Sequence, residues 1–347
     1  MWKNSILHIR SRAPLRIGLG GGGSDIEAYS SLYDGAVLNA TISLFAYATL
    51  CPRNDSKVTI TSIDKDKHQV FEAGEPSERE DELKLLWGVW DEISKENGKV
   101  KGFDLETYVD APSGSGLGSS STLVVAILGA FCEWLNLAYG EYDIAKIAHK
   151  IERVNLQLDG GKQDQYASTF GGFNFIEFLR NDSVIVNPLR IRSDYIDELQ
   201  LNLILCYMGK SRESAKVIRD QVSNLGIVNS PSVEAMHQLK EQAFLMKKAL
   251  LKGELNDIGE ILHYGWQEKK KTSESITNEY IDEIYEEALK MGATGGKISG
   301  AGGGGFMMFY CPANTRYKVI NRLHTMGCEF RRYQFEKNGL KTWRLNR

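Results

Sequence analysis

A glycine-rich loop at residues 112–122 constrains this chain more than any other segment. It has the sequence Pro-Ser-Gly-Ser-Gly-Leu-Gly-Ser-Ser-Ser-Thr and leads into an apolar run that extends to residue 137. Glycines can adopt positive φ angles and let the backbone approach an anion, and the N-terminus of the helix that should begin near Ser119 attracts negative charge. The loop therefore predicts a phosphate site suited to ATP, formed by Pro112, Ser113, Gly114, Ser115, Gly116, Leu117, Gly118, Ser119, Ser120 and Ser121.

Two better-known phosphate motifs do not fit this loop. A Walker A loop carries a lysine directly after its second glycine, and residues 112–122 contain no lysine. A dinucleotide fingerprint has the spacing Gly-x-Gly-x-x-Gly, whereas the glycines here stand at 114, 116 and 118. One alternative stays open, that the loop is a tight turn which only lets the helix pack closely.

The length of the chain predicts two domains, because 347 residues exceed the size at which a single core usually stops growing. Strand and helix patterns alternate through the first half, and after about residue 195 mostly helical segments surround strands near 201–207 and 306–310. We expect an α+β fold with domains at 1–195 and 196–347.

Local signals predict several element boundaries. Residues 6–10 and 15–19 are typical of two short strands, and Ser24 with Glu27 has the spacing of a capping box that starts a helix. Longer helices are expected over residues 119–137 and 142–156.

Composition argues against a nucleic-acid partner and against a membrane protein. The formal net charge is −3, and no apolar run approaches ~18 residues. The one basic cluster, Lys269-Lys270-Lys271, lies in a helical segment rich in Glu and Gln, so we predict a solvated face. Five scattered cysteines indicate a reducing compartment, which favours a cytoplasmic protein: Cys51, Cys132, Cys206, Cys311 and Cys328.

Two acidic residues could supply what the neutral loop lacks. Mg²⁺ bound to ATP takes one or two oxygen ligands from protein, and Glu152 with a serine hydroxyl of the loop could provide them. Asp164 follows a Gly-Gly break and could orient an attacking hydroxyl or accept its proton. The alternatives are a surface ion pair of Glu152 with Lys146 or Arg153, and a helix-capping role for Asp164.

Two charged residues near the N-terminus also suggest a site. Arg16 is a lone cation in an apolar strand-like run, which a partner such as Asp164 or a phosphoryl group would explain, although an edge strand reaching solvent would explain it too. Asp25 follows the Gly20–Gly23 run and Ser24, where its carboxylate could accept hydroxyls of a sugar.

Three motifs in order resemble those of the GHMP kinases, the superfamily of galactokinase, homoserine kinase, mevalonate kinase and phosphomevalonate kinase. They are Pro-Leu-Arg with Gly-Gly-Gly-Ser-Asp at residues 14–25, the loop at 112–121, and Lys-Ile-Ser-Gly-Ala-Gly-Gly-Gly-Gly at 297–305. The resemblance implies an N-terminal domain like ribosomal protein S5, a ferredoxin-like C-terminal domain and an active site between them. Galactokinases differ in the first motif, where they have Gly-Glu-His-Thr-Asp.

The resemblance also implies roles for individual residues. Asp164 matches the catalytic aspartate, and Arg16 matches the basic residue beside it that stabilises transferred charge. Glu152 and Ser120 match the Mg²⁺ ligands, and Asp25 matches the carboxylate that binds sugar hydroxyls. The implied activity is ATP-dependent transfer of a phosphoryl group, with Mg²⁺ as the metal.

Within the superfamily, residues 16–25 and 160–168 are most similar to the D-glycero-D-manno-heptose 7-phosphate kinases, followed by fucokinase-type enzymes. That similarity implies phosphorylation of an anomeric hydroxyl on a small-molecule sugar phosphate. A second phosphate requires cations. The expected substrate residues are Gly22, Gly23, Ser24, Asp25, Lys162, Lys210, Arg212, Lys297, Gly302 and Gly303. A neutral-sugar kinase and a non-catalytic sensor of the same fold remain alternatives, and a homodimer is left open.

Overall fold

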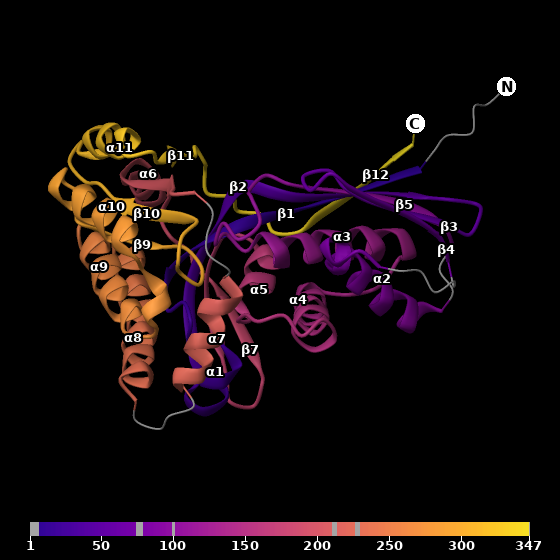
Figure 1. The fold of residues 1–347 in the computed structure, drawn as a ribbon, viewed down its shortest axis with the longest axis horizontal. Helices are drawn as coiled ribbons and strands as arrows, with labels where there is room; N and C mark the ends of the chain where they lie inside the picture. The colour runs from indigo at the N-terminus through magenta and orange to yellow at the C-terminus, as the bar shows by residue number, and fades with distance from the viewer. Residues whose placement is uncertain (1–6, 74–78, 99–100, 210–213, 226–229, 347) are drawn as a thin grey trace.

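The computed structural model describes residues 7–73, 79–98, 101–209, 214–225 and 230–346. Two units lie next to each other in Figure 1, each with its own β-sheet and its own helices. The expected two-domain α+β architecture is therefore confirmed.

The first sheet is organised around two long strands, β1 (Leu7–Gly20) and β2 (Gly35–Pro52). Within the described residues its order is β12-β1-β2-β5-β3-β4, and β2 also pairs with β6, which pairs with β7. In the part of this sheet that the structure describes, β3 and β5 run parallel and the other pairs are antiparallel. The remaining strands are β3 (Lys57–Ser62), β4 (Lys67–Glu72), β5 (Phe103–Val109), β6 (Phe173–Phe178), β7 (Val184–Pro188) and β12 (Lys341–Asn346).

The expectation of two short strands in the first twenty residues was wrong, because β1 is one strand with irregular pairing. Its register against β2 shifts after Pro14 and again after Gly18. Proline donates no N–H and glycine lacks a side chain, and both residues are typical of bulges rather than of regular ladders. The bulges let one strand span the sheet and still end at the glycine turn.

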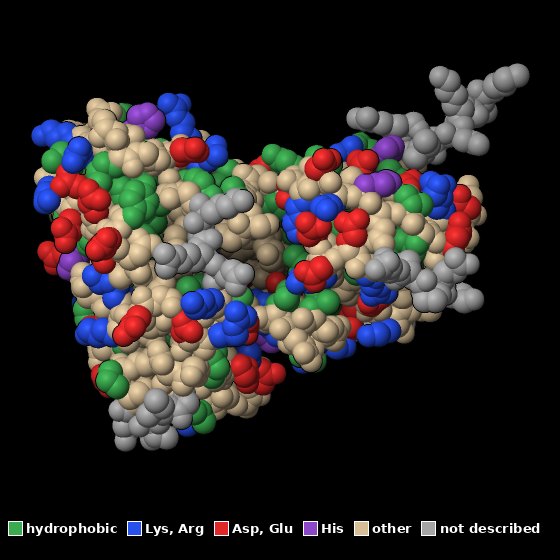
Figure 2. Space-filling view, viewed as in Figure 1, with side chains coloured by type: hydrophobic (Ala, Val, Ile, Leu, Met, Phe, Trp, Pro, Cys, Tyr) green, Lys and Arg blue, Asp and Glu red, His purple; other side chains and the backbone are tan. Residues whose placement is uncertain are grey.

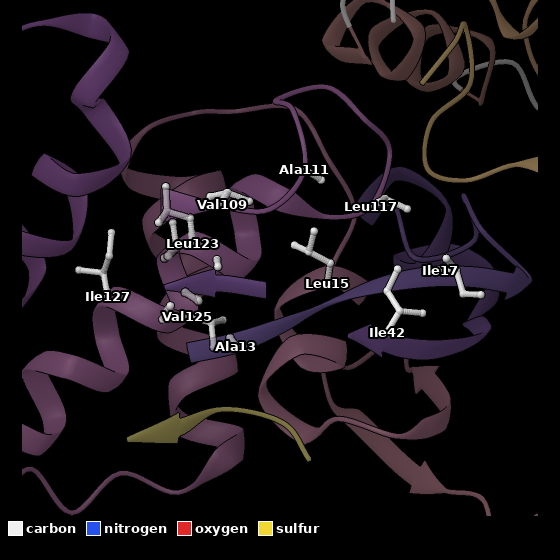
Figure 3. Packing of buried hydrophobic residues seen from close by; sticks show 14 of the residues in the cluster. Ala13, Leu15, Ile17, Ile42, Val109, Ala111, Leu117, Leu123, Val125 and Ile127 are labelled. Carbon is white, nitrogen blue, oxygen red and sulfur yellow. The ribbon is translucent and has the colours of Figure 1, made fainter. Parts of the chain in front are cut away.

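Helices cover one face of this sheet, below it in Figure 1. Their centre is α3 (Ser119–Leu135), which is buried at every position from 121 to 131 and packs on β1 and β2. Figure 3 shows Leu123 and Ile127 of α3 in the same cluster as Leu15 of β1. A helix buried all round is held rigidly, so its N-terminus is a fixed point. The other elements on this side are η1 (Asp81–Leu83), α2 (Lys84–Asn97), α4 (Glu141–His149), η2 (Lys150–Asn155) and α5 (Gln163–Phe170).

The second unit has a ferredoxin-like arrangement. Its sheet has the order β11-β8-β10-β9, with all pairs antiparallel, and helices follow β8 and β10. The strands are β8 (Leu203–Tyr207), β9 (Gly295–Ile298), β10 (Phe306–Tyr310) and β11 (Glu329–Phe330). The helices are α6 (Ser193–Asn202), α7 (Ser214–Leu225), α8 (Pro231–Lys252), α9 (Asp257–Lys270), η3 (Glu274–Ile276), α10 (Glu279–Lys290) and α11 (Arg316–Thr325).

The two units pack against each other, and the last strand of the chain lies in the sheet of the first unit. The last strand, β12, pairs with β1 of the first sheet, so the chain returns to the N-terminal unit at its end. Helix α8 packs on β1 and β2, and its Ala243 and Met246 belong to the same core cluster as Leu15. The boundary near residue 195 stays a prediction. The two sheets do not fully follow the division into 1–195 and 196–347, because β12 near the C-terminus belongs to the first sheet. Among the described helices none is long and apolar enough to cross a membrane.

The capping box expected at Ser24 and Glu27 was also wrong. Helix α1 runs over Glu27–Tyr33, and no side chain caps its N-terminus. The Ser24 hydroxyl instead lies 2.9 Å from the carbonyls of Gly21 and Ala36, and donates within the glycine turn. Ser24 therefore fixes the turn after β1 rather than the start of a helix.

Candidate active site

The glycine loop has the backbone geometry that the sequence predicts. Gly114, Gly116 and Gly118 have φ angles of 76°, 81° and 77°, and Gly118 directly precedes α3, which begins at Ser119 as expected. No side chain caps the first turn of α3. Its first N–H groups have no partner within the helix, so they are available to an anion.

The third glycine run packs backbone to backbone against this loop. A Cβ at Gly116 would lie 2.1 Å from the carbonyl oxygen of Ser299, and one at Gly300 would lie 2.8 Å from Cα of Gly116. The N–H of Phe306 donates to the Ser115 carbonyl at 2.9 Å. Glycine is required at these positions because any side chain would push the loops apart. The C-terminal unit therefore supports the shape of the N-terminal loop.

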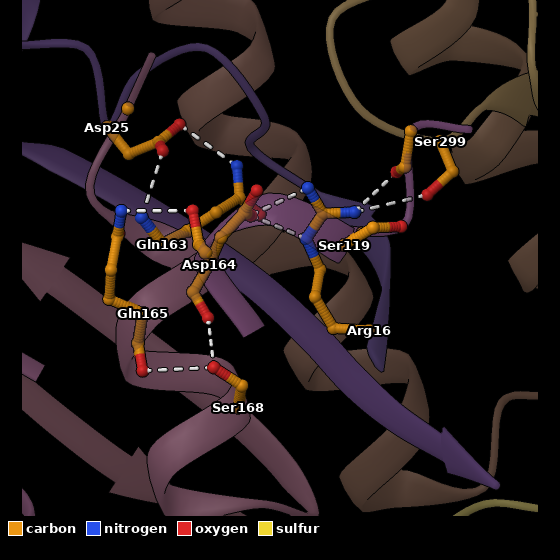
Figure 4. A network of polar contacts seen from close by, with 12 residues as sticks. Arg16, Asp25, Ser119, Gln163, Asp164, Gln165, Ser168 and Ser299 are labelled. Carbon is orange, nitrogen blue, oxygen red and sulfur yellow. Dashed lines mark hydrogen bonds and ion pairs between the residues drawn. The ribbon is translucent and has the colours of Figure 1, made fainter. Parts of the chain in front are cut away.

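Arg16 is the residue that joins these motifs. Its guanidinium contacts Oδ1 of Asp164 through Nε at 2.7 Å and Nη2 at 2.6 Å, and Nη1 donates to the Gly116 carbonyl at 2.6 Å and to Ser299 Oγ at 3.3 Å. Figure 4 shows the guanidinium between Asp164 and Ser299. The Arg16 side chain is 4% exposed and that of Asp164 is 21% exposed. The buried arginine has the partner that the sequence suggested, and one face of the carboxylate remains open.

Asp164 stands in the first turn of α5 and lies directly against the glycine loop. A Cβ at Gly118 would be 3.2 Å from Asp164 Cγ. A carboxylate thus sits beside the phosphate-binding backbone. Repulsion would make this placement unfavourable for an anion if Arg16 did not balance the charge.

Asp25 holds the turn that leads into α5. Its carboxylate accepts hydrogen bonds from the N–H of Gly23 at 3.0 Å, the N–H of Gln163 at 3.1 Å and Nε2 of Gln163 at 3.1 Å. In α5, therefore, the capping partner comes from residue 25 and not from Asp164. These contacts fix the position of Asp164 through its neighbour Gln163.

Glu152 lies in η2, a short π-helical segment that continues α4, and it is 1% exposed. Its Oε2 accepts a hydrogen bond from Gln165 Nε2 at 2.5 Å, and the same Nε2 is 3.1 Å from Ser121 Oγ. Burial raises the pKa of Glu152, and Arg153, at 3.7 Å, opposes that rise. A surface ion pair between Glu152 and Arg153 was one of the alternatives that the sequence left open. The two residues are in contact, but the carboxylate of Glu152 is buried.

The surroundings of Glu152 fit a divalent cation that also binds phosphate. The buried Oε1 of Gln165 has no hydrogen-bond partner in the part of the chain that the structure describes, and Ser120 is exposed on the same cleft as Glu152. Across the described ranges no group of three or more His, Cys, Asp or Glu could hold a metal alone. One carboxylate with a hydroxyl suits Mg²⁺, which takes its other ligands from water and phosphate.

A cleft of about 690 Å³ connects these groups. Figure 2 shows the surface hollowed between the two units. Its lining includes Lys65, Leu85 and the loop at Ser113, together with Asp25, Lys269 and Ala301. Arg16, Asp164 and Glu152 line the same cleft.

Some expected substrate residues lie elsewhere. Lys162 makes ion pairs with Glu27 and with Asp182 and lines a different hollow, so it does not face the cleft. Gly302 and Gly303 pack against Ser275 and Ile276. Lys210 and Arg212 lie outside the described residues. Gly22 and Gly23 lie in the turn after β1, and Lys297 is buried beside that turn.

Lys269 is a cleft residue that the sequence reasoning missed. The prediction of a solvated face was wrong for this residue, which is 5% exposed and donates to the Gly22 carbonyl at 3.0 Å. A signal was present, because Lys269 continues the buried stripe of α9 formed by Ile258, Leu262 and Trp266 at helical spacing. A lysine on an apolar stripe indicates a buried cation even when its two neighbours are charged.

Comparison with known proteins identifies the family of the chain. Residues 84–172 match the GHMP kinases N terminal domain and residues 246–327 match the GHMP kinases C terminal domain. The chain is 44% identical over 338 residues to the D-glycero-alpha-D-manno-heptose 7-phosphate kinase of Campylobacter jejuni, covering 97% of this chain and 99% of that protein. The chain belongs to the GHMP kinase family, and it is a phosphotransferase that uses ATP.

Solved structures of similar proteins cover nearly the whole chain. A D-glycero-D-manno-heptose 1-phosphate kinase from Bacteroides thetaiotaomicron matches with a TM-score of 0.82 at 40% identity, covering 96% of this chain and 98% of the other. A putative sugar kinase from Campylobacter jejuni matches with a TM-score of 0.80 at 43% identity, covering 97% and 98%. The two-unit fold is thus that of sugar kinases in this family.

Proposed function

We propose that this protein phosphorylates the anomeric hydroxyl of D-glycero-D-manno-heptose 7-phosphate with ATP, which gives the 1,7-bisphosphate. The observation that carries the proposal is the 44% identity, over nearly all of both chains, to a heptose 7-phosphate kinase. The product would be an intermediate for activated heptose in surface polysaccharide.

The arrangement of Arg16 and Asp164 supports a mechanism based on positioning and electrostatics. With ATP phosphates on the loop at 112–121, the open face of Asp164 would accept a hydrogen bond from the sugar O1 hydroxyl. O1 then bonds to the γ-phosphorus as the bond from that phosphorus to the β–γ bridging oxygen breaks, and the O1 proton moves to Asp164. Arg16 holds the carboxylate in place and lies where it can offset charge on the transferred group.

Mg²⁺ would be held by Glu152 and Ser120 together with ATP, as the burial of Glu152 and the open Ser120 hydroxyl favour. When bound, the ion would neutralise charge on the phosphates. In this scheme Gln165 orients Glu152 through its amide.

A coupled ADP-release assay tests the proposal, with heptose 7-phosphate, free heptose, fucose and galactose as acceptors. Much faster turnover of the phosphorylated heptose than of any neutral sugar, and a new anomeric phosphate in the ³¹P NMR spectrum, are the expected results. Equal or faster turnover of a neutral sugar would instead support the neutral-sugar kinase. No turnover with any acceptor, together with tight ATP binding, would support a non-catalytic sensor.

A cytoplasmic location is also proposed, since none of the five cysteines is in a disulfide, as in proteins of a reducing compartment. The absence of a nucleic-acid partner and the homodimer stay predictions.

A further inference from the structure

Two lysines from the C-terminal unit are buried beside the glycine turn that ends β1. Lys269 comes from the last turn of α9 and Lys297 from β9, and they are 5% and 4% exposed. Nζ of Lys269 donates to the Gly22 carbonyl at 3.0 Å, and Nζ of Lys297 donates to the Gly18 carbonyl at 3.1 Å. Their side chains therefore meet the turn from two separate elements.

The two ammonium groups have no ion-pair partner among the described residues. The nearby carboxylate of Asp25 accepts three hydrogen bonds from Gly23 and Gln163, and Asp164 is paired with Arg16. Burial lowers the pKa of Lys269 to about 8, with Asp25 opposing and Arg16 adding to the shift. Burial, followed by the charges of Lys269 and Arg16, lowers the pKa of Lys297 to about 7.

Such a pair is unfavourable for folding, so it calls for a reason. Each ammonium carries three donors, and one protein acceptor is found for each in the described ranges. Buried lysines without an anion are rare because no interaction compensates for the lost hydration of the ammonium group. A ligand with two or more negative oxygens would use the spare donors and supply the missing charge.

The ammonium groups of both lysines lie close to the glycines of this turn. A Cβ at Gly22 would lie 3.9 Å from Nζ of Lys297 and 3.9 Å from Nε2 of Gln163, and one at Gly23 would lie 3.3 Å from Nζ of Lys269. Lys269 and Gly23 line the same cleft as Arg16 and Asp164. Lys269 therefore reaches the cleft itself, whereas Lys297 is buried next to the same glycine turn.

We propose that Lys269 and Lys297 form the subsite for the phosphate group that the acceptor sugar already carries. This inference rests on the proposed function, in that the acceptor is a sugar phosphate. The phosphate monoester would lie between the two ammonium groups and the turn at Gly22, while the anomeric hydroxyl reaches Asp164. The pair would then be the element that selects a phosphorylated sugar over a neutral one.

The kinetic test compares K269M and K297M with K271M, a control on the same helix end whose Lys271 is exposed and pairs with Glu268. K269M and K297M should each lose about 10- to 100-fold in kcat/KM for heptose 7-phosphate, which is the effect of one hydrogen bond to a charged group. The KM for ATP, and kcat/KM for free heptose, should change by less than about 3-fold. Equal losses with both acceptors, or a rise confined to the KM for ATP, would overturn the inference.

A binding test separates this inference from the proposed function. Inorganic phosphate is added to protein whose nucleotide site is filled by a non-hydrolysable ATP analogue, and the melting temperature is recorded. A phosphate-dependent rise in wild type and K271M that is absent in K269M and in K297M supports the subsite, even if no heptose phosphate is turned over. The same rise in K269M and K297M, or no rise in wild type, would contradict it, and circular dichroism of each variant shows that the fold is intact.

Discussion

Two pairs of charged side chains lie at or next to the cleft, and they differ in whether the protein balances their charge. Arg16 and Asp164 are in direct contact at 2.6 Å, and Arg16 has further acceptors at Gly116 and Ser299. Among the described residues, Lys269 and Lys297 reach only backbone carbonyls. The balanced pair is fully formed without ligand, as preorganised catalysis requires, whereas the unbalanced pair is complete only with an anion bound.

The largest effect is expected from Asp164→Asn, which removes the negative charge from the Arg16–Asp164 pair. The amide keeps the size of the side chain but cannot accept the proton, so kcat should fall by ~10²–10⁴-fold, while the Kd for ATP stays nearly constant. Steady-state kinetics and calorimetric titration with ATP measure the two effects. A variant that keeps more than about a tenth of wild-type kcat would remove Asp164 from the base role and leave it a positioning group.

A second change acts on the loop that accepts a hydrogen bond from Arg16. Gly116→Ala places a Cβ 2.1 Å from the Ser299 carbonyl at a residue with φ of 81°, so the loop must shift. We expect a loss of about 3 kcal/mol in the free energy of unfolding, from strain and clash together, and weaker ATP binding. Urea denaturation and ATP titration check both.

The matched control is Gly327→Ala. Gly327 has φ of 90°, and a Cβ there would meet nothing within 4 Å, so it carries only the cost of the left-handed backbone, about 1 kcal/mol. If both variants lost the same stability and neither changed ATP binding, the close approach of the two loops would have no role in the site.

Glu152 is a further buried ionisable group beside the cleft, and its carboxylate accepts a hydrogen bond from the side-chain amide of Gln165. Gln165→Leu removes the 2.5 Å hydrogen bond to Glu152, so the Mg²⁺ concentration for half-maximal activity should rise by about 10-fold. Titration of Mg²⁺ at saturating ATP measures this. The change should leave the KM for the sugar unaltered, and an unaltered Mg²⁺ requirement would separate Glu152 from the metal.

The parts of the site that could be predicted from sequence are those set by local rules. Positive φ at Gly114, Gly116 and Gly118 follows from glycine spacing, and the start of α3 follows from the serines after them. The partner of Arg16 followed from the cost of an unpaired buried arginine. These features depend on residue type and on the neighbouring chain.

The predictions that were wrong concern positions that depend on how elements distant in the sequence pack together. Lys162 stands beside Gln163 and Asp164, yet its side chain pairs with Glu27 and Asp182 and lines a different hollow. Lys269 looked solvated because Lys270 and Lys271 are charged, although it continues the apolar stripe of α9 that packs against the rest of the unit. The return of β12 to β1 is a long-range pairing that no local pattern encodes.

The smallest expected effect concerns the pH dependence of the unbalanced pair. The lowered pKa values of Lys297, about 7, and Lys269, about 8, lie below the ordinary lysine value near 10.4, so the unfolded chain binds more protons between these values. Stability of the ligand-free protein should therefore rise with pH through this window, and the full cost of the buried charges should be present below pH ~7. Anion binding needs the charged lysines, so phosphate affinity should fall over the same range.

Thermal melting of wild type and K297M from pH 6 to 9 isolates this contribution from other titrating groups. Because the variant has no charge to bury at residue 297, it should melt a few degrees higher than wild type at pH 6, and the gap should narrow by pH 9. Saturating phosphate should reverse the order at pH 6, since only wild type keeps both cations for the anion. A constant gap across the pH range would mean that Lys297 stays charged in the fold with a partner of its own, and the contrast with the Arg16 pair would be lost.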